Sequence, residues 1–325
     1  MSSSLQVGII GCGAIGTEHA QCLASLDGVS LRGFCDTDAE RAAALTRAYA
    51  NTYSTTSPAE LLADDAIEAV YICTQTDSHS GLGIAAARAG KHIMMEKPLA
   101  LTARECNSVA EAVEKSGVTF MTAFKLRFND AVQRARGFIP APTLAIAQMT
   151  DLRWPATFWG NDPVKGGGNV LSQGCHSVDL LYHLIGSEPV RIYAEGGNYH
   201  HRDTAIFDTL VATIQFENGA VGSLVQADSG HTPFLSKFSF QLFDGVRSAH
   251  LHNRLKSLTL WDGVRMEQCE APQETGMIGE TRAFIRAIRE NTPPPTTVRD
   301  GVRATLVLLA AMEASRTQTP QIIHL

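Results

Sequence analysis

A Gly-x-Gly-x-x-Gly motif at residues 11–16 constrains the fold of this chain more than any other feature of its sequence. The motif follows a short apolar run and opens a helix-like stretch at 15–26, as a dinucleotide-binding turn between a strand and a helix does. In such a turn Gly11 permits the sharp bend, Gly13 lets the backbone approach a pyrophosphate, and Gly16 lets the helix pack closely on the strand. Free N–H groups at the helix start then face the anion. The motif therefore predicts a dinucleotide site.

An acidic residue lies where such a site needs one. A second strand-like run, 29–35, ends at Asp36, which is 20 residues after Gly16. A carboxylate at this distance accepts hydrogen bonds from both hydroxyls of the adenosine ribose, and it would repel a 2′-phosphate. The sequence therefore favours NAD over NADP, while Arg41 lies near enough to keep NADP open as the alternative.

Strand-like and helix-like segments alternate from the motif to residue 123. The expected strands lie at 7–10, 29–35, 69–73, 92–95 and 118–123, and the expected helices at 15–26, 39–50, 80–89 and 103–115. This alternation is typical of right-handed βαβ crossovers, so residues 1–123 are predicted to form a Rossmann domain with a doubly wound parallel sheet. The length of 325 residues leaves room for a second domain, 124–325.

Residues 124–325 have the pattern of antiparallel strands. Two-residue turn signals separate strand-like runs at Asn218-Gly219, Asp244-Gly245 and Asp262-Gly263. With helix-like stretches at 278–289 and 302–315, the pattern predicts an α+β domain with a large, mainly antiparallel open sheet. Helices cover only one face of such a sheet, so its partly apolar second face predicts self-association.

Composition and charge exclude several classes of protein. The hydrophobic fraction of 44% and charged fraction of 18% are typical of a soluble globular chain. The net charge of −6 offers no basic field for nucleic acid or an anionic membrane. No positive region precedes the first apolar run, and no apolar run approaches about 18 residues, so we expect a cytoplasmic protein. Seven cysteines without a CxxC pair are typical of reduced thiols.

A Glu96-Lys97-Pro98 tripeptide follows the expected strand at 92–95. Ligands of open α/β sheets bind at the carboxyl ends of the strands. Oxidation of an alcohol needs a group that takes the hydroxyl proton while the hydride leaves, and a partly buried lysine can do this. The residues alone leave two interpretations of Lys97 open, a proton-transfer group or a lysine that closes a turn before proline.

A second segment with several candidate functional residues, 166–179, joins a glycine-rich stretch to an apolar, helix-like run. Ser172, His176 and Asp179 fall at spacings of four and three, which places them on one helical face if the helix starts early enough. His176 would then accept a proton or bind a substrate hydroxyl, with Asp179 fixing its tautomer. The alternative is a capped, buried histidine with a structural role.

The remaining histidines and Cys12 suggest no further chemistry. No third ligand lies at a recognisable spacing from His176, and hydride transfer to NAD requires no metal, so no metal is expected. His200 and His201 are adjacent rather than one helical turn apart, which predicts that they decorate a loop. Cys12, inside the glycine turn, is expected to be a small filler rather than a nucleophile.

Three stretches resemble the glucose-fructose oxidoreductase and inositol 2-dehydrogenase family, often called Gfo/Idh/MocA. They are Thr-Gln-Thr-Asp-Ser-His at 74–79, Ala-Gly-Lys-His-Ile-Met-Met-Glu-Lys-Pro-Leu-Ala at 89–100, and the 166–179 segment. The resemblance spans essentially the whole chain, and its Glu-Lys-Pro element is the most specific. It implies an NAD(P)-dependent oxidoreductase of sugars or cyclitols, with a Rossmann domain and a C-terminal α+β domain whose open sheet builds dimers or tetramers.

The resemblance also implies roles for individual residues. The implied cofactor-binding residues are Gly11, Gly13, Ala14, Ile15, Gly16, Asp36, Thr74, Gln75, His79, Glu96, Lys97 and Lys125. The implied substrate-binding residues are Lys97, Arg127, Trp154, Trp159, Ser172 and His176, with Lys97 and His176 as the catalytic pair. Lys125 stands where the family often has asparagine. For Trp154 and Trp159, stacking on the sugar's C–H face and a role in the core both stay open.

The chain departs from the family pattern at Ser172, where many members have an aspartate four residues before the histidine. A serine hydroxyl donates and accepts hydrogen bonds but holds no negative charge near pH 7. We therefore expect a different proton relay, or a carboxylate from Asp151, Asp162 or Asp179 that enters the site.

Three functions remain open at this stage. The first is an NAD-dependent dehydrogenase or reductase that acts on a hydroxyl of a monosaccharide, cyclitol or sugar derivative. The second is a non-redox regulatory protein that binds NAD, which the aspartate missing at Ser172 motivates. The third is an enzyme that uses tightly bound NAD transiently, as in glycoside cleavage or epimerisation.

Overall fold

The computed structural model describes residues 4–230, 236–271 and 276–325, and they form two compact units. Unit 1 contains the chain up to Ala100, Arg104–Phe124 and Met277–Val302. Unit 2 contains Leu101–Ala103, Lys125–Gly276 and Arg303–Leu325. The expected division into 1–123 and 124–325 therefore differs from the observed units at residues 277–302, and also at 101–103 and Phe124.

Unit 1 is built on a six-stranded parallel sheet with the order β3-β2-β1-β4-β5-β6. Its strands are β1 (Leu5–Ile10), β2 (Val29–Cys35), β3 (Tyr53–Thr55), β4 (Ala69–Ile72), β5 (His92–Met95) and β6 (Phe120–Thr122). Its helices are α1 (Ala14–Ala24), α2 (Ala39–Ala48), α3 (Pro58–Ala63), α4 (Thr76–Arg88), α5 (Ala103–Ser116) and α8 (Met277–Glu290). This is the doubly wound Rossmann sheet expected from the sequence.

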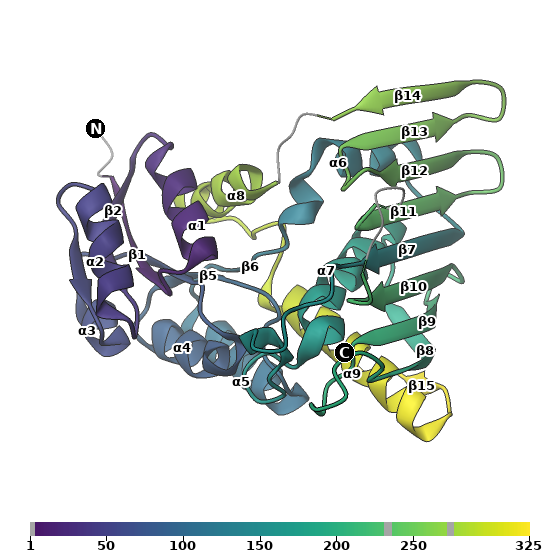
Figure 1. Ribbon diagram of the computed structural model, residues 1–325. Helices are drawn as coiled ribbons and strands as arrows, with labels where there is room; N and C mark the ends of the chain where they lie inside the picture. Colours follow the sequence, from purple (N-terminus) through teal and green to yellow (C-terminus); the bar gives the residue numbers. More distant parts are fainter. Residues whose placement is uncertain (1–3, 231–235, 272–275) are drawn as a thin grey trace. The chain divides into compact units, whose positions relative to one another are not determined.

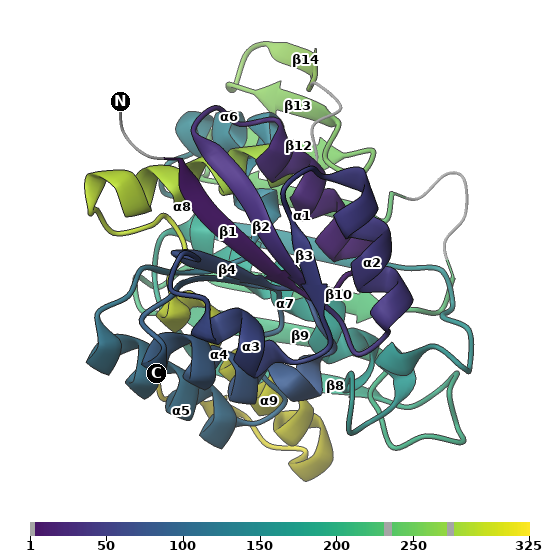
Figure 2. The ribbon, with the colours of Figure 1, turned by 90° about the vertical axis from the view of Figure 1, so that its left-hand side faces the viewer.

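Helices cover both faces of this sheet, with α1, α2 and α8 on one side and α3, α4 and α5 on the other (Figures 1 and 2). Two of them begin at side-chain caps: Asp38 accepts from the amides of the first turn of α2, and Ser57 from an amide of α3. The central strands β1 and β4 are almost fully buried, since helices pack on them from both sides.

Three contacts explain why residues 277–302 belong to unit 1. Phe284 on α8 is buried and packs edge-on against the ring of Tyr71, with ring centroids 5.6 Å apart. Arg289 Nη2 donates to the carbonyl oxygen of Gly28 at 2.7 Å, and Thr296 Oγ1 donates to that of Thr122 at 2.7 Å. Residues 277–302 therefore contribute to the core and to the hydrogen bonding of unit 1. These contacts join residues that are distant in the sequence, so a local pattern does not reveal them.

Unit 2 is built on a nine-stranded sheet with the order β14-β13-β12-β11-β7-β10-β9-β8-β15. Its strands are β7 (Leu144–Thr150), β8 (Pro189–Gly197), β9 (Thr209–Phe216), β10 (Val221–Ala227), β11 (Phe238–Phe243), β12 (Ser248–His252), β13 (Ser257–Trp261), β14 (Met266–Glu270) and β15 (Gln321–Ile322). Its helical segments are η1 (Lys125–Phe128), α6 (Asp130–Phe138), η2 (Trp159–Asn161) and α7 (Gly168–Ile185). The long helix α9 (Val298–Thr317) begins in unit 1 and continues into unit 2.

All three expected turn dipeptides join antiparallel neighbours, so the prediction of a mainly antiparallel sheet is confirmed. Within the described part of the nine-stranded sheet, β7 and β10 are the only neighbours that pair in parallel. Helix α7 packs on β7, β9 and β10, and α6 packs on β12 and β13. On β9 the residues Leu210, Ala212, Ile214 and Phe216 face this covered side, as their alternation predicts.

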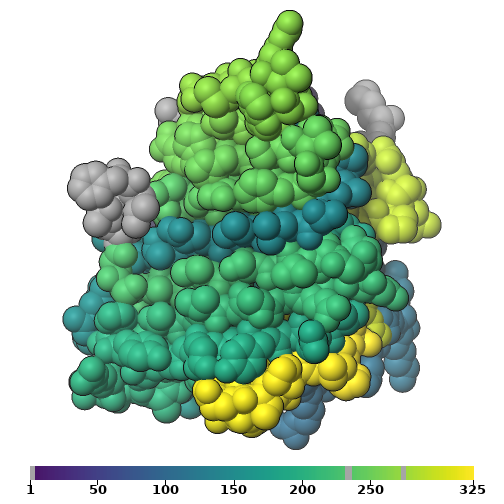
Figure 3. Space-filling model, turned by 90° about the vertical axis from the view of Figure 1, so that its right-hand side faces the viewer, coloured from purple at the N-terminus to yellow at the C-terminus, as the bar shows by residue number. Residues whose placement is uncertain are grey.

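The second face of the sheet carries no helix in the part of the unit that the structure describes, and its strands run across the surface in Figure 3. Apolar side chains on this face include Val211, Val221, Trp261 and Met266, whose exposed fractions range from 40% to 64%. Among the described residues, no helix is both long and apolar enough to cross a membrane.

Candidate active site

Two of the three glycines of the motif occupy positions where a side chain would change the turn, and the third adjoins open space. Gly11 has a φ of +97°, and a Cβ there would lie 2.5 Å from the carbonyl oxygen of Cys73. A Cβ on Gly16 would lie 1.9 Å from the carbonyl oxygen of Gly11, because α1 crosses the end of β1 at close range. A Cβ on Gly13 would meet nothing within 4 Å, so open space adjoins the backbone there. The turn therefore fits a bound pyrophosphate.

Helix α1 begins directly after this turn with its first amides available to an anion. Gly13 is the N-cap residue and has no side-chain cap bond, and the first turn, which includes Ala14 and Ile15, contains no acidic residue. Burial, with Asp36 as a further cause, raises the pKa of the Cys12 thiol to about 12. Cys12 is therefore a neutral filler in this turn at physiological pH.

The carboxylate of Asp36 is fixed at the end of β2 by two backbone amides. Cys12 N donates to Oδ2 at 2.7 Å, and Asp38 N donates to Oδ1 at 2.9 Å. The first bond joins the acid directly to the glycine turn, so the two elements that a dinucleotide requires lie together. Arg41 is the residue that leaves NADP open as the alternative cofactor. Its Nε lies 3.4 Å from Asp38 Oδ2 in an exposed ion pair.

The 74–79 segment forms the start of α4 and is braced against the turn after β5. His79 is buried, with Nδ1 2.8 Å from the carbonyl oxygen of Pro98 and Nε2 3.2 Å from that of Thr74. Burial lowers the pKa of His79, and the shorter contact assigns the proton of the neutral ring to Nδ1. His79 thus holds the start of α4 to the turn after β5 through the bond from Nδ1 to Pro98. Direct cofactor contacts from Thr74, Gln75 and His79 stay predictions.

Glu96 and Lys97 lie at the carboxyl end of β5, and a histidine that the sequence analysis missed holds the carboxylate. His19 on α1 is fully buried, with Nε2 3.2 Å from Glu96 Oε1. Lys97 N donates to Glu96 Oε2 at 3.2 Å. The only local signal for His19 is its place on the buried face of α1, three residues after Gly16. The Lys97 side chain is half-buried.

In unit 2, α7 begins at Gly168, early enough to place Ser172, His176 and Asp179 on one helical face. Ser172 and His176 are buried, with exposed fractions of 7% and 5%. The Asp179 carboxylate is bound by Arg127 from η1, with Nε 2.9 Å from Oδ2 and Nη2 2.5 Å from Oδ1. This buried bidentate pair occupies two donors of Arg127, a predicted substrate residue, and neutralises the Asp179 carboxylate.

The two other carboxylates considered as replacements for the family aspartate also have partners. Asp151, at the end of β7, accepts from Lys237 Nζ at 2.7 Å and from Leu152 N at 2.9 Å. Asp162 accepts from Val164 N at 2.8 Å and so shapes the loop before α7. Within the described residues, no group of three His, Cys, Asp or Glu side chains is arranged to hold a metal ion.

Trp154 and Trp159 belong to an aromatic cluster in the loop between β7 and α7. The ring of Phe158 lies edge-on to Trp154 at 4.9 Å and tilted to Trp159 at 5.3 Å. Gly160 lies against this cluster, since a Cβ there would come within 2.7 Å of the Trp154 ring. Both tryptophans are half-buried, so each keeps part of its ring accessible.

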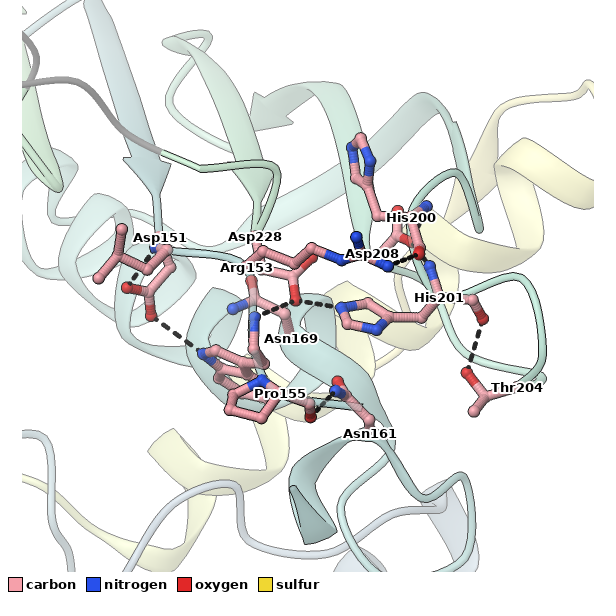
Figure 4. Close-up of polar contacts among 12 residues, drawn as sticks. Asp151, Arg153, Pro155, Asn161, Asn169, His200, His201, Thr204, Asp208 and Asp228 are labelled. Carbon is pink, nitrogen blue, oxygen red and sulfur yellow. Dashed lines mark hydrogen bonds and ion pairs between the residues drawn. The ribbon is translucent and has the colours of Figure 1, made fainter. Parts of the chain in front are cut away.

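His200 and His201 both lie in the loop between β8 and β9, as predicted, but the structure gives His201 an internal partner. Its side chain is buried, and Nε2 lies 2.7 Å from Asp228 Oδ2 (Figure 4). The ring of His200 points away from this pair in the same view. Asp228 follows β10, 27 residues from His201, so the partner is invisible in the local sequence.

In comparisons with known proteins, two family models match separate parts of the chain. Residues 5–124 match the family described as "Oxidoreductase family, NAD-binding Rossmann fold", and residues 135–235 match the GFO/IDH/MocA C-terminal domain. The chain is 26% identical to a myo-inositol 2-dehydrogenase of Thermotoga maritima, over 95% of this chain and 96% of that protein. It is 28% identical to a scyllo-inositol 2-dehydrogenase (NAD⁺) of Bacillus subtilis, over 69% and 67%.

A levoglucosan dehydrogenase solved in complex with NADH has a similar fold. It superposes with a TM-score of 0.89 at 22% identity, covering 98% of this chain and 99% of the other. At this identity the likeness concerns the fold alone.

We predict that Asp36→Ala lowers the preference for NAD over NADP by about tenfold or more, because the variant loses a charged acceptor for the ribose hydroxyls and the repulsion of a 2′-phosphate. The measurement is kcat/KM with each cofactor in the wild type and the variant. Asp38→Asn is the matched control, since it removes a neighbouring charge but keeps an acceptor at the cap of α2. A wild-type preference for NADP, or a ratio that Asp36→Ala leaves unchanged, would contradict the assignment.

Proposed function

This chain belongs to the Gfo/Idh/MocA family of oxidoreductases, and we propose that it transfers a hydride between a nicotinamide cofactor and a hydroxyl-bearing carbon of a monosaccharide, cyclitol or sugar derivative. The observation that carries the proposal is the turn at Gly13, which is open to a ligand and is hydrogen-bonded to Asp36 through the preceding residue, Cys12. The inositol dehydrogenases among the similar proteins support this substrate class.

When bound, the cofactor supplies a ring carbon that accepts or returns a hydride. The chain's own residues would hold it and move the proton. The amides at the start of α1 would bind the pyrophosphate, and Asp36 would bind the adenosine ribose. The Nζ of Lys97 would take the proton of the substrate hydroxyl in oxidation and return it in reduction.

His176 would bind the reacting hydroxyl, and Ser172 would contribute a neutral hydrogen bond in place of a carboxylate. The partners found for Asp151, Asp162 and Asp179 favour this arrangement over one in which another acid replaces the family aspartate. Trp154 and Trp159 would offer apolar surface to the C–H face of the sugar.

We further infer that the protein works in the cytoplasm. Its seven cysteines are all free thiols. Free thiols are typical of reducing compartments.

The direct test is a screen of polyols and aldoses with NAD, followed by the absorbance of the reduced nicotinamide. Net formation of NADH supports the proposal. Transient reduction without net NADH indicates an enzyme that uses tightly bound NAD within one turnover. No reduction with any polyol at high concentration favours a regulatory NAD-binding protein.

We predict that Lys97→Met lowers kcat by about 10²- to 10⁴-fold and leaves NADH affinity nearly unchanged, since the lysine acts on the hydroxyl proton. Turnover and NADH fluorescence titration measure the two effects. Lys91→Met is the control, because the Lys91 ammonium is bonded to the carbonyl oxygens of Asp64 and Ile67 and has a structural role. A near-normal kcat in Lys97→Met would leave Lys97 as a turn residue only.

We also predict that substitutions at two positions of α7 lower kcat/KM to different degrees. Ser172→Ala removes one neutral hydrogen bond and costs about 1 kcal/mol in kcat/KM, whereas His176→Ala costs about 100-fold or more. Ser177→Ala is the control from the same helix, since Ser177 Oγ bonds to Gln226 Oε1 at 3.4 Å inside unit 2. The reverse order for Ser172 and His176 would show that the two roles are wrongly assigned.

We infer that the open sheet face of unit 2 assembles the protein as a homodimer or homotetramer. Val211→Lys and Trp261→Glu place charges on this face and should dissociate the oligomer. Val264→Lys is the matched control, because Val264 is 79% exposed in the turn between β13 and β14. Light scattering coupled to size-exclusion chromatography gives the mass of each variant. A monomeric wild type would refute the inference.

A further inference from the structure

Two loops of unit 2 are tied together at one end of the sheet. One loop, 151–167, joins β7 to α7, and the other, 198–208, joins β8 to β9. Arg153 Nη2 donates to the carbonyl oxygen of His200 at 2.7 Å, which links the loops directly. A second link runs through a buried aspartate at the end of β10 (Figure 4).

That aspartate, Asp228, joins both loops through a single oxygen atom. Trp154 N donates to Asp228 Oδ2 at 3.3 Å, and His201 Nε2 lies 2.7 Å from the same atom. Because a carboxylate only accepts, Nε2 carries the proton of this contact. Within the residues that the structure describes, Oδ1 of Asp228 has no hydrogen-bond partner. The buried carboxylate therefore depends on His201 and Trp154 for its compensation.

The loop that carries His201 is itself rigidly held. Asp208 is fully buried and accepts from the backbone amides of Tyr199, His200 and His201. Although burial opposes it, these amide bonds lower the pKa of Asp208. His201 thus reaches Asp228 from a backbone that has little freedom to move.

The same loop also reaches the start of the helix that carries His176. Val170 N donates to the carbonyl oxygen of Phe207 at 3.4 Å. A Cβ on Gly168 would lie 2.8 Å from Cβ of Ile206, so the loop packs closely on the first turn of α7. Its position is therefore coupled to that of the predicted substrate helix.

Trp154 is held at its ring as well as at its backbone. Its indole Nε1 donates to Asp151 Oδ2 at 3.3 Å, and Asp151 is paired with Lys237. Phe158 and Gly160 pack against the ring, as described above. These contacts leave a half-exposed indole with a fixed orientation, which suits it to stack on an apolar face of a ligand.

We propose that the His201–Asp228 pair is a positioning element that sets substrate affinity, because it fixes the backbone of Trp154 and so the plane that the indole presents to a sugar ring. The proposal rests on the proposed function and deepens it, since it assigns part of the recognition of a polyhydroxylated ring to these residues. Neither His201 nor Asp228 takes part in proton or hydride transfer. Their loss should therefore raise KM for the sugar and leave the chemical step intact.

The kinetic test compares variants on each side of the pair. His201→Leu and Asp228→Ala should each raise KM for the sugar about tenfold, with kcat within about twofold of wild type and NADH affinity unchanged. The double variant should be no worse than either single variant, because the two residues act as one unit. Asp228→Asn keeps an acceptor in place of Oδ2 and should recover most of the affinity.

His200→Ala is the matched control. It removes the adjacent imidazole but keeps the backbone bonds of residue 200 to Asp208 and Arg153, so KM should stay at the wild-type value. An equal rise of KM in His200→Ala, or an unchanged KM in both His201→Leu and Asp228→Ala, would overturn the proposal.

A second measurement does not depend on activity. The chain has three tryptophans, so Trp159→Phe with Trp261→Phe leaves Trp154 as the sole indole emitter. In this background His201→Leu and Asp228→Asn should be compared with His200→Ala by acrylamide quenching, with thermal unfolding as a check of folding. Increased quenching in His201→Leu alone supports the proposal, and equal quenching in all three overturns it. If the wild type oxidises no sugar, the proposed function fails, whereas the quenching result still decides whether the pair positions Trp154.

Discussion

The close approach of α1 to the end of β1 is the constraint on which the rest of unit 1 depends. Only a residue without a side chain fits at Gly16, because a Cβ there would lie 1.9 Å from the carbonyl oxygen of Gly11. This approach lets the turn amide of Cys12 reach Asp36 on β2. It also places His19, one turn further along α1, against Glu96 at the end of β5. One backbone contact therefore orders three strand ends where a dinucleotide binds.

In unit 2 the central helix α7 is buried along nearly its whole length and still carries polar groups, which need partners in the interior. Arg127 neutralises Asp179, and Gln226 Nε2 donates to Asn169 Oδ1 at 2.7 Å. Unpaired charges in such an interior would be costly. A neutral side chain at Ser172 adds no further charge to this helix, which gives a physical reason for serine at a position where the family often has aspartate.

The parts of the fold that the sequence predicts well depend on local patterns. The expected strands at 29–35 and 92–95 have the bounds that the structure shows, since glycine or charged residues flank both of them. The three hairpins follow from turn dipeptides. The short edge strand β3 lacks such a pattern, since its three residues are half-buried or exposed. The parallel pairing of β7 with β10 and the place of 277–302 in unit 1 depend on contacts between distant residues.

The same distinction between local patterns and contacts of distant residues applies to the candidate site. The motifs identified the glycine turn, where backbone geometry requires glycine, and they identified Asp36 and the Glu96-Lys97 pair by their places directly after two strands. The motifs did not identify His19, and they did not predict that His201 is buried. A histidine acquires such a role from a carboxylate that lies far along the chain. His200 and His201 show this most clearly, because adjacent residues of one type differ completely in environment. Asp208 binds the amides of both residues, and this shared backbone turn directs one imidazole towards Asp228 and the other away from it (Figure 4). A buried polar residue of this kind becomes predictable only when the fold supplies the position of its partner.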